Sequence, residues 1–145
     1  MTALLDVNVL LALAWPNHVH HDSAIEWFIE YQANGWATCP ITENGFVRVS
    51  SNPRFTPEAK SPAEAMLQLE RMISLEGHEF WSDSFSLTEP GRVERSRLHG
   101  HDRVTDAYLL ALAVDRGGRL ATYDKKIRTL LPETHEREIL IQMGV

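Results

Sequence analysis

The chain has 145 residues, 43% of them hydrophobic, and a formal net charge of -6 at pH 7. This length suits one compact core, so we expect residues 1–145 to form a single domain. The one cysteine excludes an internal disulfide, the short apolar runs exclude a membrane-spanning helix, and the negative charge argues against a surface that coats nucleic acid broadly.

The first half of the chain alternates short apolar runs with helical patterns. An apolar run favours a strand, and apolar residues at helical spacing favour an amphipathic helix. Asp6 falls where the first strand meets the first helix. The predicted elements are a strand at 3–5, a helix at about 7–14 that Pro16 stops, a helix at about 20–33, a strand at 36–39, and a helix capped by Thr42 that carries Glu43 and closes at Ser51.

The second half continues this alternation. Ser61 and Glu64 form a capping box with a proline between them, which is typical of a helix start. The predicted elements are a helix from Ser61 to about 73, a strand at 79–82, an irregular charged stretch at 88–101, a helix from a cap at Asp102 to about 116, and strands at 120–123 and 139–142. Strands that alternate with helices imply parallel crossovers, so we predict an α/β domain whose ligands gather beyond the carboxyl ends of its strands.

Four acids stand out against this background. Asp6 lies in an apolar run, Asp106 lies in the apolar helix "VTDAYLLALA", and Glu43 and Asp124 each follow a predicted strand. Any one of them has an ordinary interpretation as a helix cap or a solvated side chain, although capping does not explain Asp106. Crowded together, four carboxylates repel one another unless a multivalent cation neutralises them. Such oxygen ligands suit Mg²⁺ or Mn²⁺ and a metal-assisted attack of water on a phosphodiester.

These residues carry a resemblance to a known family. The segments "LLDVNVLLAL", "TENGFVRVSSNPRF" and "VTDAYLLALAVDRGGRLATYDKKI", with the final strand, resemble the PIN-domain ribonucleases, and most closely the VapC toxins of bacterial toxin–antitoxin pairs. The resemblance implies a three-layer α/β/α sandwich with a mostly parallel central sheet, and endonucleolytic cleavage of RNA with Mg²⁺ or Mn²⁺. It implies that the metal-binding and catalytic residues are Asp6, Glu43, Asp106 and Asp124, with Asn8 and Thr122 as supporting polar residues that are otherwise explained by local turn bonding.

The same resemblance implies partners. It predicts an RNA substrate, a VapB-like antitoxin that covers the site, and a homodimer. The surplus negative charge would attract a basic segment of such an antitoxin. No basic leader precedes an apolar segment at the N-terminus, so we expect a cytoplasmic protein without a membrane segment. Metal-assisted attack of water predicts products with a 5′-phosphate instead of a 2′,3′-cyclic phosphate.

Several alternatives stay open at this level. The stretch "HVHHD" from His18 to Asp22 has the H-x-H-x-D order of a dinuclear zinc hydrolase, and "DVNV" is similar to the D-x-D of haloacid-dehalogenase-like phosphohydrolases, with Asn8 in place of the second Asp. A third alternative is a PIN fold that binds RNA or protein without catalysis. Asp102 lies one helical turn before Asp106 and competes with it for the third acidic position.

Two interpretations are open for the basic residues near the acids. They either contact RNA phosphates around the metal site or are ordinary solvated side chains. The residues in question are Arg48, Arg103, Lys125, Lys126 and Arg128.

Overall fold

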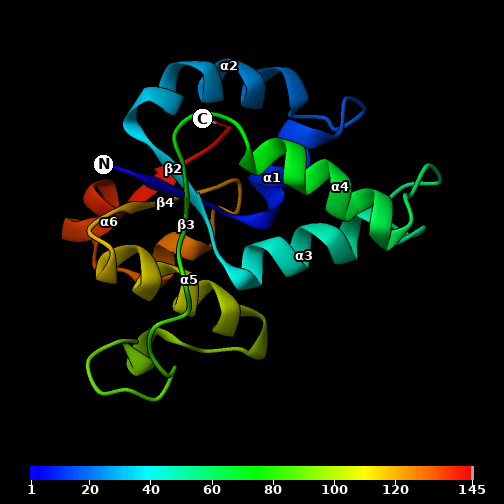
Figure 1. The fold of residues 1–145 in the computed structure, drawn as a ribbon. Helices are drawn as coiled ribbons and strands as arrows, with labels where there is room; N and C mark the ends of the chain where they lie inside the picture. The colour runs from blue at the N-terminus through cyan, green and yellow to red at the C-terminus, as the bar shows by residue number, and fades with distance from the viewer. Residues whose placement is uncertain (145) are drawn as a thin grey trace.

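A sheet of five short parallel strands forms the centre of the protein (Figure 1). The computed structural model describes residues 1–144, and their side chains apart from that of Arg137. Every strand pair described is parallel, and the order across the sheet is β3-β2-β1-β4-β5. The strands are β1 (Ala3–Leu5), β2 (Trp36–Thr38), β3 (His78–Phe80), β4 (Arg119–Thr122) and β5 (Leu140–Gln142).

Helices cover both faces of this sheet, because alternate strand residues point to opposite sides. Ala3 and Leu5 pack with α1 to α4 in one core, whereas Leu4 packs with α5 and the residues around α6 in the other. Figure 1 shows α2 and α5 on opposite sides of the strands. The helices are α1 (Val7–Ala14), α2 (His21–Tyr31), α3 (Pro40–Ser50), α4 (Pro62–Ile73), α5 (Val104–Asp115) and α6 (Glu133–Ile139), with short 3-10 turns η1 (Gln32–Asn34), η2 (Arg95–Arg97), η3 (His101–Arg103) and η4 (Ile127–Leu130). The predicted three-layer α/β/α sandwich is therefore confirmed.

Most of the predicted elements are present within a residue or two of their expected bounds. The strand at 3–5, the helix at 7–14 and the Ser61 capping box occur as predicted, and Ser61 Oγ accepts a hydrogen bond from the Glu64 amide at 3.1 Å. The third strand is shifted toward the N-terminus, to His78–Phe80. Helix α6 lies where no helix was predicted. Among residues 1–144, no helix is long and apolar enough to cross a bilayer.

Two predicted helix caps are wrong. Helix α3 begins at Pro40 with Cys39 at its N-cap, so Thr42 lies inside the first turn, where its hydroxyl accepts a hydrogen bond from the Cys39 amide. Asp102 does not cap α5, because η3 precedes that helix and leads directly into it. The Arg103 amide is already bonded to the Gly100 carbonyl at 3.1 Å, so the chain enters α5 without a side-chain cap.

Candidate active site

The candidate site lies at the carboxyl edge of the sheet, between β1 and β4. From β1 the chain passes to β2 and β3 on one side, whereas β4 and β5 lie on the other side. The strand order therefore reverses between β1 and β4, and crevices at such switch points are the usual ligand sites of open α/β sheets. Asp6 directly follows β1, and Asp124 follows β4 by two residues. Leu5 and Ala121 are paired in register, so the sheet itself brings the two acids together.

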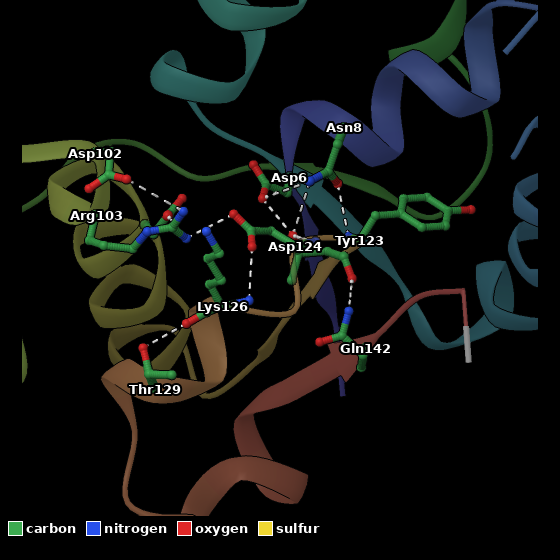
Figure 2. Close-up of polar contacts among 11 residues, drawn as sticks. Asp6, Asn8, Asp102, Arg103, Tyr123, Asp124, Lys126, Thr129 and Gln142 are labelled. Atoms are coloured by element: carbon green, nitrogen blue, oxygen red, sulfur yellow. Dashed lines mark hydrogen bonds and ion pairs between the residues drawn. The ribbon is translucent and has the colours of Figure 1, made fainter. Parts of the chain in front are cut away.

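Asp6 is held on both of its carboxylate oxygens, and Figure 2 shows the oxygen that faces Asn8. Its Oδ1 accepts a hydrogen bond from the Val7 amide at 2.8 Å and thereby caps α1, while its Oδ2 accepts one from the Thr122 hydroxyl at 2.8 Å. The residue is only 8% exposed. Burial raises the pKa of Asp6, and the bonds from Thr122 and Val7 oppose this shift. The carboxylate is thus fixed in orientation but short of positive charge.

Thr122 and Asn8 connect the ends of β1 and β4. The Thr122 hydroxyl, which donates to Asp6, also accepts a hydrogen bond from the Asp124 amide at 3.0 Å. The Asn8 amide nitrogen lies 3.2 Å from the same hydroxyl and 3.4 Å from Asp6 Oδ2, and its oxygen accepts from the Tyr123 amide at 3.1 Å (Figure 2). The bond from the Asp124 amide to Thr122 and that from Asn8 to Asp6 are local, whereas the other three join Asp6 and Asn8 to the end of β4. They set the position of Asp6 relative to Asp124.

Asp106 reaches the site from the first turn of α5. Seven consecutive residues after it, 107–113, are buried, so this helix runs through the core and places a carboxylate against it. Burial raises the pKa of Asp106 to about 6, with further contributions from the negative charges of Asp6 and Asp124. Burial is the main cause of this shift, and the charges of Asp6 and Asp124 add to it while Arg103 opposes it.

Arg103 bridges Asp106 and Asp124. Its Nη1 lies 3.0 Å from Asp106 Oδ2 and 2.8 Å from Asp124 Oδ2. The other oxygen of Asp124 accepts a hydrogen bond from the Lys126 amide at 2.9 Å (Figure 2). Burial alone would raise the pKa of Asp124, but the bonds from Lys126 and Arg103 outweigh it and lower the pKa. From the sequence, Arg103 was expected either to contact RNA phosphates or to be solvated. Its i,i+3 spacing from Asp106, at which ion pairs form, was the signal for the contact that the structure shows.

Glu43 lies apart from the three aspartates. It occupies the first turn of α3, and its Oε2 accepts a hydrogen bond at 2.7 Å from the hydroxyl of the buried Thr38, the last residue of β2. The same hydroxyl lies 2.7 Å from His78 Nε2. Asp6 and Asp124 both act on the pKa of Asp106, and Asp124 acts on that of Asp6, whereas the charge of Glu43 acts on the pKa of His78. The structure therefore brings together three of the four predicted acids and places the fourth beside the neighbouring strand.

The donor set of the three aspartates fits a hard divalent cation. All the side-chain ligands on offer are carboxylate oxygens, which are the ligands that Mg²⁺ and Mn²⁺ prefer. The negative charges of Asp6 and Asp124 contribute to the raised pKa of Asp106, and a cation would offset them. Among residues 1–144, no three acidic, histidine or cysteine side chains are already arranged around a cation position. The guanidinium of Arg103 contacts both Asp106 and Asp124.

The histidine-rich stretch does not form the alternative zinc site. His18 Nδ1 accepts a hydrogen bond from the His20 amide at 3.0 Å, and His21 Nδ1 lies 2.8 Å from the Ala12 carbonyl oxygen. The His20 ring stacks on Tyr123, with ring centroids 4.4 Å apart. The three rings serve the start of α2 and its packing on the sheet, and the zinc hydrolase alternative is not supported.

Asp102 lies at the edge of this network, and the side chains of the remaining basic residues lie at the surface. The Asp102 side chain is 62% exposed, and its carboxylate is 3.9 Å from Arg103. This position favours Asp106 over Asp102 as the third acid. Lys125, Lys126, Arg128 and Arg48 are exposed, so they are free to contact a large substrate.

Comparisons with known proteins place this site in a family. The model of the PIN domain matches residues 3–130. Ribonuclease VapC39 of Mycobacterium tuberculosis is 54% identical over 124 residues, which cover 86% of this chain and 89% of that protein. Ribonuclease VapC44 of the same organism is 51% identical over 127 residues, covering 88% and 89%.

A solved structure shares the fold. The crystal structure of VapBC2 from Rickettsia felis bound to a DNA fragment from their promoter superposes with a TM-score of 0.69 over 99% of this chain and 100% of that chain, at 17% sequence identity. The high identity to two ribonucleases, over most of both chains, excludes the haloacid-dehalogenase-like alternative. The chain therefore belongs to the PIN-domain family and, within it, to the VapC-type ribonucleases.

Proposed function

We propose that Asp6, Asp106 and Asp124 hold a divalent cation, Mg²⁺ or Mn²⁺, at the centre where this VapC-type endoribonuclease hydrolyses RNA. One observation carries the proposal: carboxylates from the ends of β1 and β4 and from the first turn of α5 meet at the switch point of the sheet. The raised pKa of Asp106 supports it, since a cation would supply the missing positive charge. Glu43 is proposed as a fourth metal-binding and catalytic acid, and its carboxylate accepts a hydrogen bond from Thr38 at the end of β2.

Asp6, Asp106 and Asp124 would hold the cation, which would supply activation of water and neutralisation of charge on the scissile phosphate. The residues of the chain supply the geometry for that chemistry. Thr122 and Asn8 fix the carboxylate of Asp6, and the Lys126 amide fixes that of Asp124. Because these bonds are already formed, the ligands need little reorganisation when RNA arrives. Exposed Lys125, Lys126, Arg128 and Arg48 are proposed contacts for the RNA phosphates.

The proposal is tested by mapping the ends of cleaved RNA. Purified protein is incubated with total RNA in EDTA, in Mg²⁺ and in Mn²⁺, and the new 5′ and 3′ ends are identified. We expect cleavage only with the cation, and products that carry a 5′-phosphate. Asp6→Asn, Asp106→Asn and Asp124→Asn should each abolish it, whereas Asp102→Asn is the matched control and should cleave like the wild type. Undiminished cleavage in EDTA, or by the three variants, would contradict the proposal, and a folded wild type that cuts no RNA would favour the non-catalytic binding alternative.

The family relation also supports proposals about partners. The chain is proposed to be the toxin of a VapBC-type pair, to bind a VapB-like antitoxin through a basic segment that the net charge of -6 attracts, and to form a homodimer in the cytoplasm. Residues 1–145 are proposed to form one PIN-like domain without a membrane segment. Light scattering on the purified chain tests the dimer, since a mass equal to one chain would contradict it.

A further inference from the structure

Arg103 occupies the space in which a shared cation would neutralise Asp106 and Asp124. A single nitrogen, Nη1, lies 3.0 Å from Asp106 Oδ2 and 2.8 Å from Asp124 Oδ2. An arginine nitrogen carries two hydrogens, and here each one points to a different carboxylate. The Arg103 side chain is only 18% exposed, and the two carboxylates are 17% and 32% exposed. The guanidinium is therefore an internal counter-ion and not a solvated surface group.

Arg103 and a divalent cation would compete for the two carboxylate oxygens that Nη1 contacts, Oδ2 of Asp106 and Oδ2 of Asp124. Its Oδ1 accepts from the Lys126 amide, and its Oδ2 accepts from Arg103. Mg²⁺ binds oxygen at about 2.0 to 2.1 Å, which is closer than any N–H donor approaches. A cation bound to Oδ2 of both Asp106 and Asp124 would therefore fill the position that Nη1 holds at 2.8 and 3.0 Å.

We propose that Arg103 is a positioning residue that holds Asp106 and Asp124 together before the metal arrives and gives up both carboxylates to the divalent cation when it binds. The inference rests on the function proposed above. Its physical reason is that carboxylates packed this closely repel one another, so an apo site needs a cation of its own to keep its shape. Arg103 fulfils that need with a permanent charge. The consequence is that metal affinity is reduced by the energy of the contacts that must be broken.

The test compares Mn²⁺ binding by the wild type with binding by Arg103→Ala, with no RNA present. Free Mn²⁺ is measured by electron paramagnetic resonance during a titration at pH 7.5. Arg128→Ala is the matched control, because it removes an equal charge from an exposed side chain of η4, close to Asp124 in the sequence. We expect Arg103→Ala to bind Mn²⁺ at least about tenfold more tightly than the wild type, which is about 1.4 kcal/mol or more, because neither contact of Arg103 has to be broken. Arg128→Ala should stay within about twofold of the wild type.

The outcomes separate this inference from the proposed function. Equal or weaker Mn²⁺ binding by Arg103→Ala, beside normal binding by the wild type, would overturn the role of Arg103 and leave the cation centre intact. No Mn²⁺ binding by any of the proteins would overturn both. If Arg103→Ala does not fold, the guanidinium resonances of the wild type are followed by nuclear magnetic resonance during a Mg²⁺ titration. A shift of the Arg103 signal with metal supports the exchange, and an unchanged signal at saturating Mg²⁺ contradicts it.

Discussion

Replacing Asp106 by asparagine should make the metal-free protein more stable at neutral pH while removing its activity. The pKa of this carboxyl is raised from 3.8 to about 6, first by burial and then by the charges of Asp6 and Asp124. A shift of roughly two pKa units corresponds to roughly 3 kcal/mol between the two protonation states. Since asparagine resembles the neutral acid, Asp106→Asn should gain up to roughly 3 kcal/mol at pH 7.5 in EDTA.

The sign of the pH dependence follows from the direction of the pKa shift. The folded chain binds the Asp106 proton more tightly than the unfolded chain, so this group favours folding at low pH. Its contribution is lost as the pH rises from about 4 to about 6. At pH 5 only part of that loss has occurred, so the advantage of Asp106→Asn should be smaller there than at pH 7.5 by roughly 1 to 2 kcal/mol.

Urea denaturation of both proteins in EDTA at pH 5 and pH 7.5 measures this difference. Asp102→Asn is the control, because it removes the same charge from an exposed carboxylate in η3, just before α5. Its stability relative to the wild type should differ little between the two pH values. The reasoning is refuted if the gap between Asp106→Asn and the wild type is the same at both pH values, or if Asp106→Asn is the less stable protein at pH 7.5.

Further predictions concern the support of the site. Thr122→Val should cost roughly 1 to 3 kcal/mol of unfolding free energy, because it removes the hydroxyl that donates to Oδ2 of the buried Asp6 carboxylate. Thr122→Ser should recover most of this loss in the same urea experiment. Mn²⁺ affinity should fall as the pH drops below about 6, because Asp106 must lose its proton before it can bind the metal. Calorimetry in buffers of different ionisation enthalpy should detect the proton released on binding at pH 5.5, and hardly any at pH 8. Gly45→Ala should lower the free energy of unfolding by roughly 1 to 3 kcal/mol, since a Cβ there would lie 2.6 Å from Val7 Cγ2, where α3 packs on α1. Thermal unfolding measures this loss. An unchanged midpoint temperature would contradict the prediction, because it would mean that α3 moves away at no cost.

The sequence predicts the helices and strands of this fold well where an apolar pattern and a capping or turn residue indicate the same boundary. The apolar run before Asp6 and the capping box at Ser61 each specify one element boundary, and both are where they were expected. Helix α6 was missed because 133–139 is a short, mostly polar stretch without a clear apolar period. The cap assigned to Asp102 was wrong because a 3-10 turn satisfied the backbone donors instead, and no side-chain pattern reveals that choice.

The sequence predicts which acids lie at the carboxyl edge of the sheet, but not which hydrogen bonds and ion pairs they form there. Acids that follow parallel strands share an edge of the sheet, so topology alone brought Asp6 near Asp124. The contact of Arg103 with two carboxylates depends on how α5 tilts against β4, and the bond between Thr38 and Glu43 depends on how α3 leaves β2. Those angles are set by core packing, which hydrophobic periodicity does not encode.

The central claim is that carboxylates from β1, α5 and β4 share one divalent cation, and crystals soaked in Mn²⁺ test it most directly. An anomalous difference map locates Mn²⁺ without reference to any assumed mechanism. We expect a peak bounded by the carboxylates of Asp6, Asp106 and Asp124 at the carboxyl edge of the sheet. A map with no peak there, or with Mn²⁺ only on other acidic residues, would contradict the account.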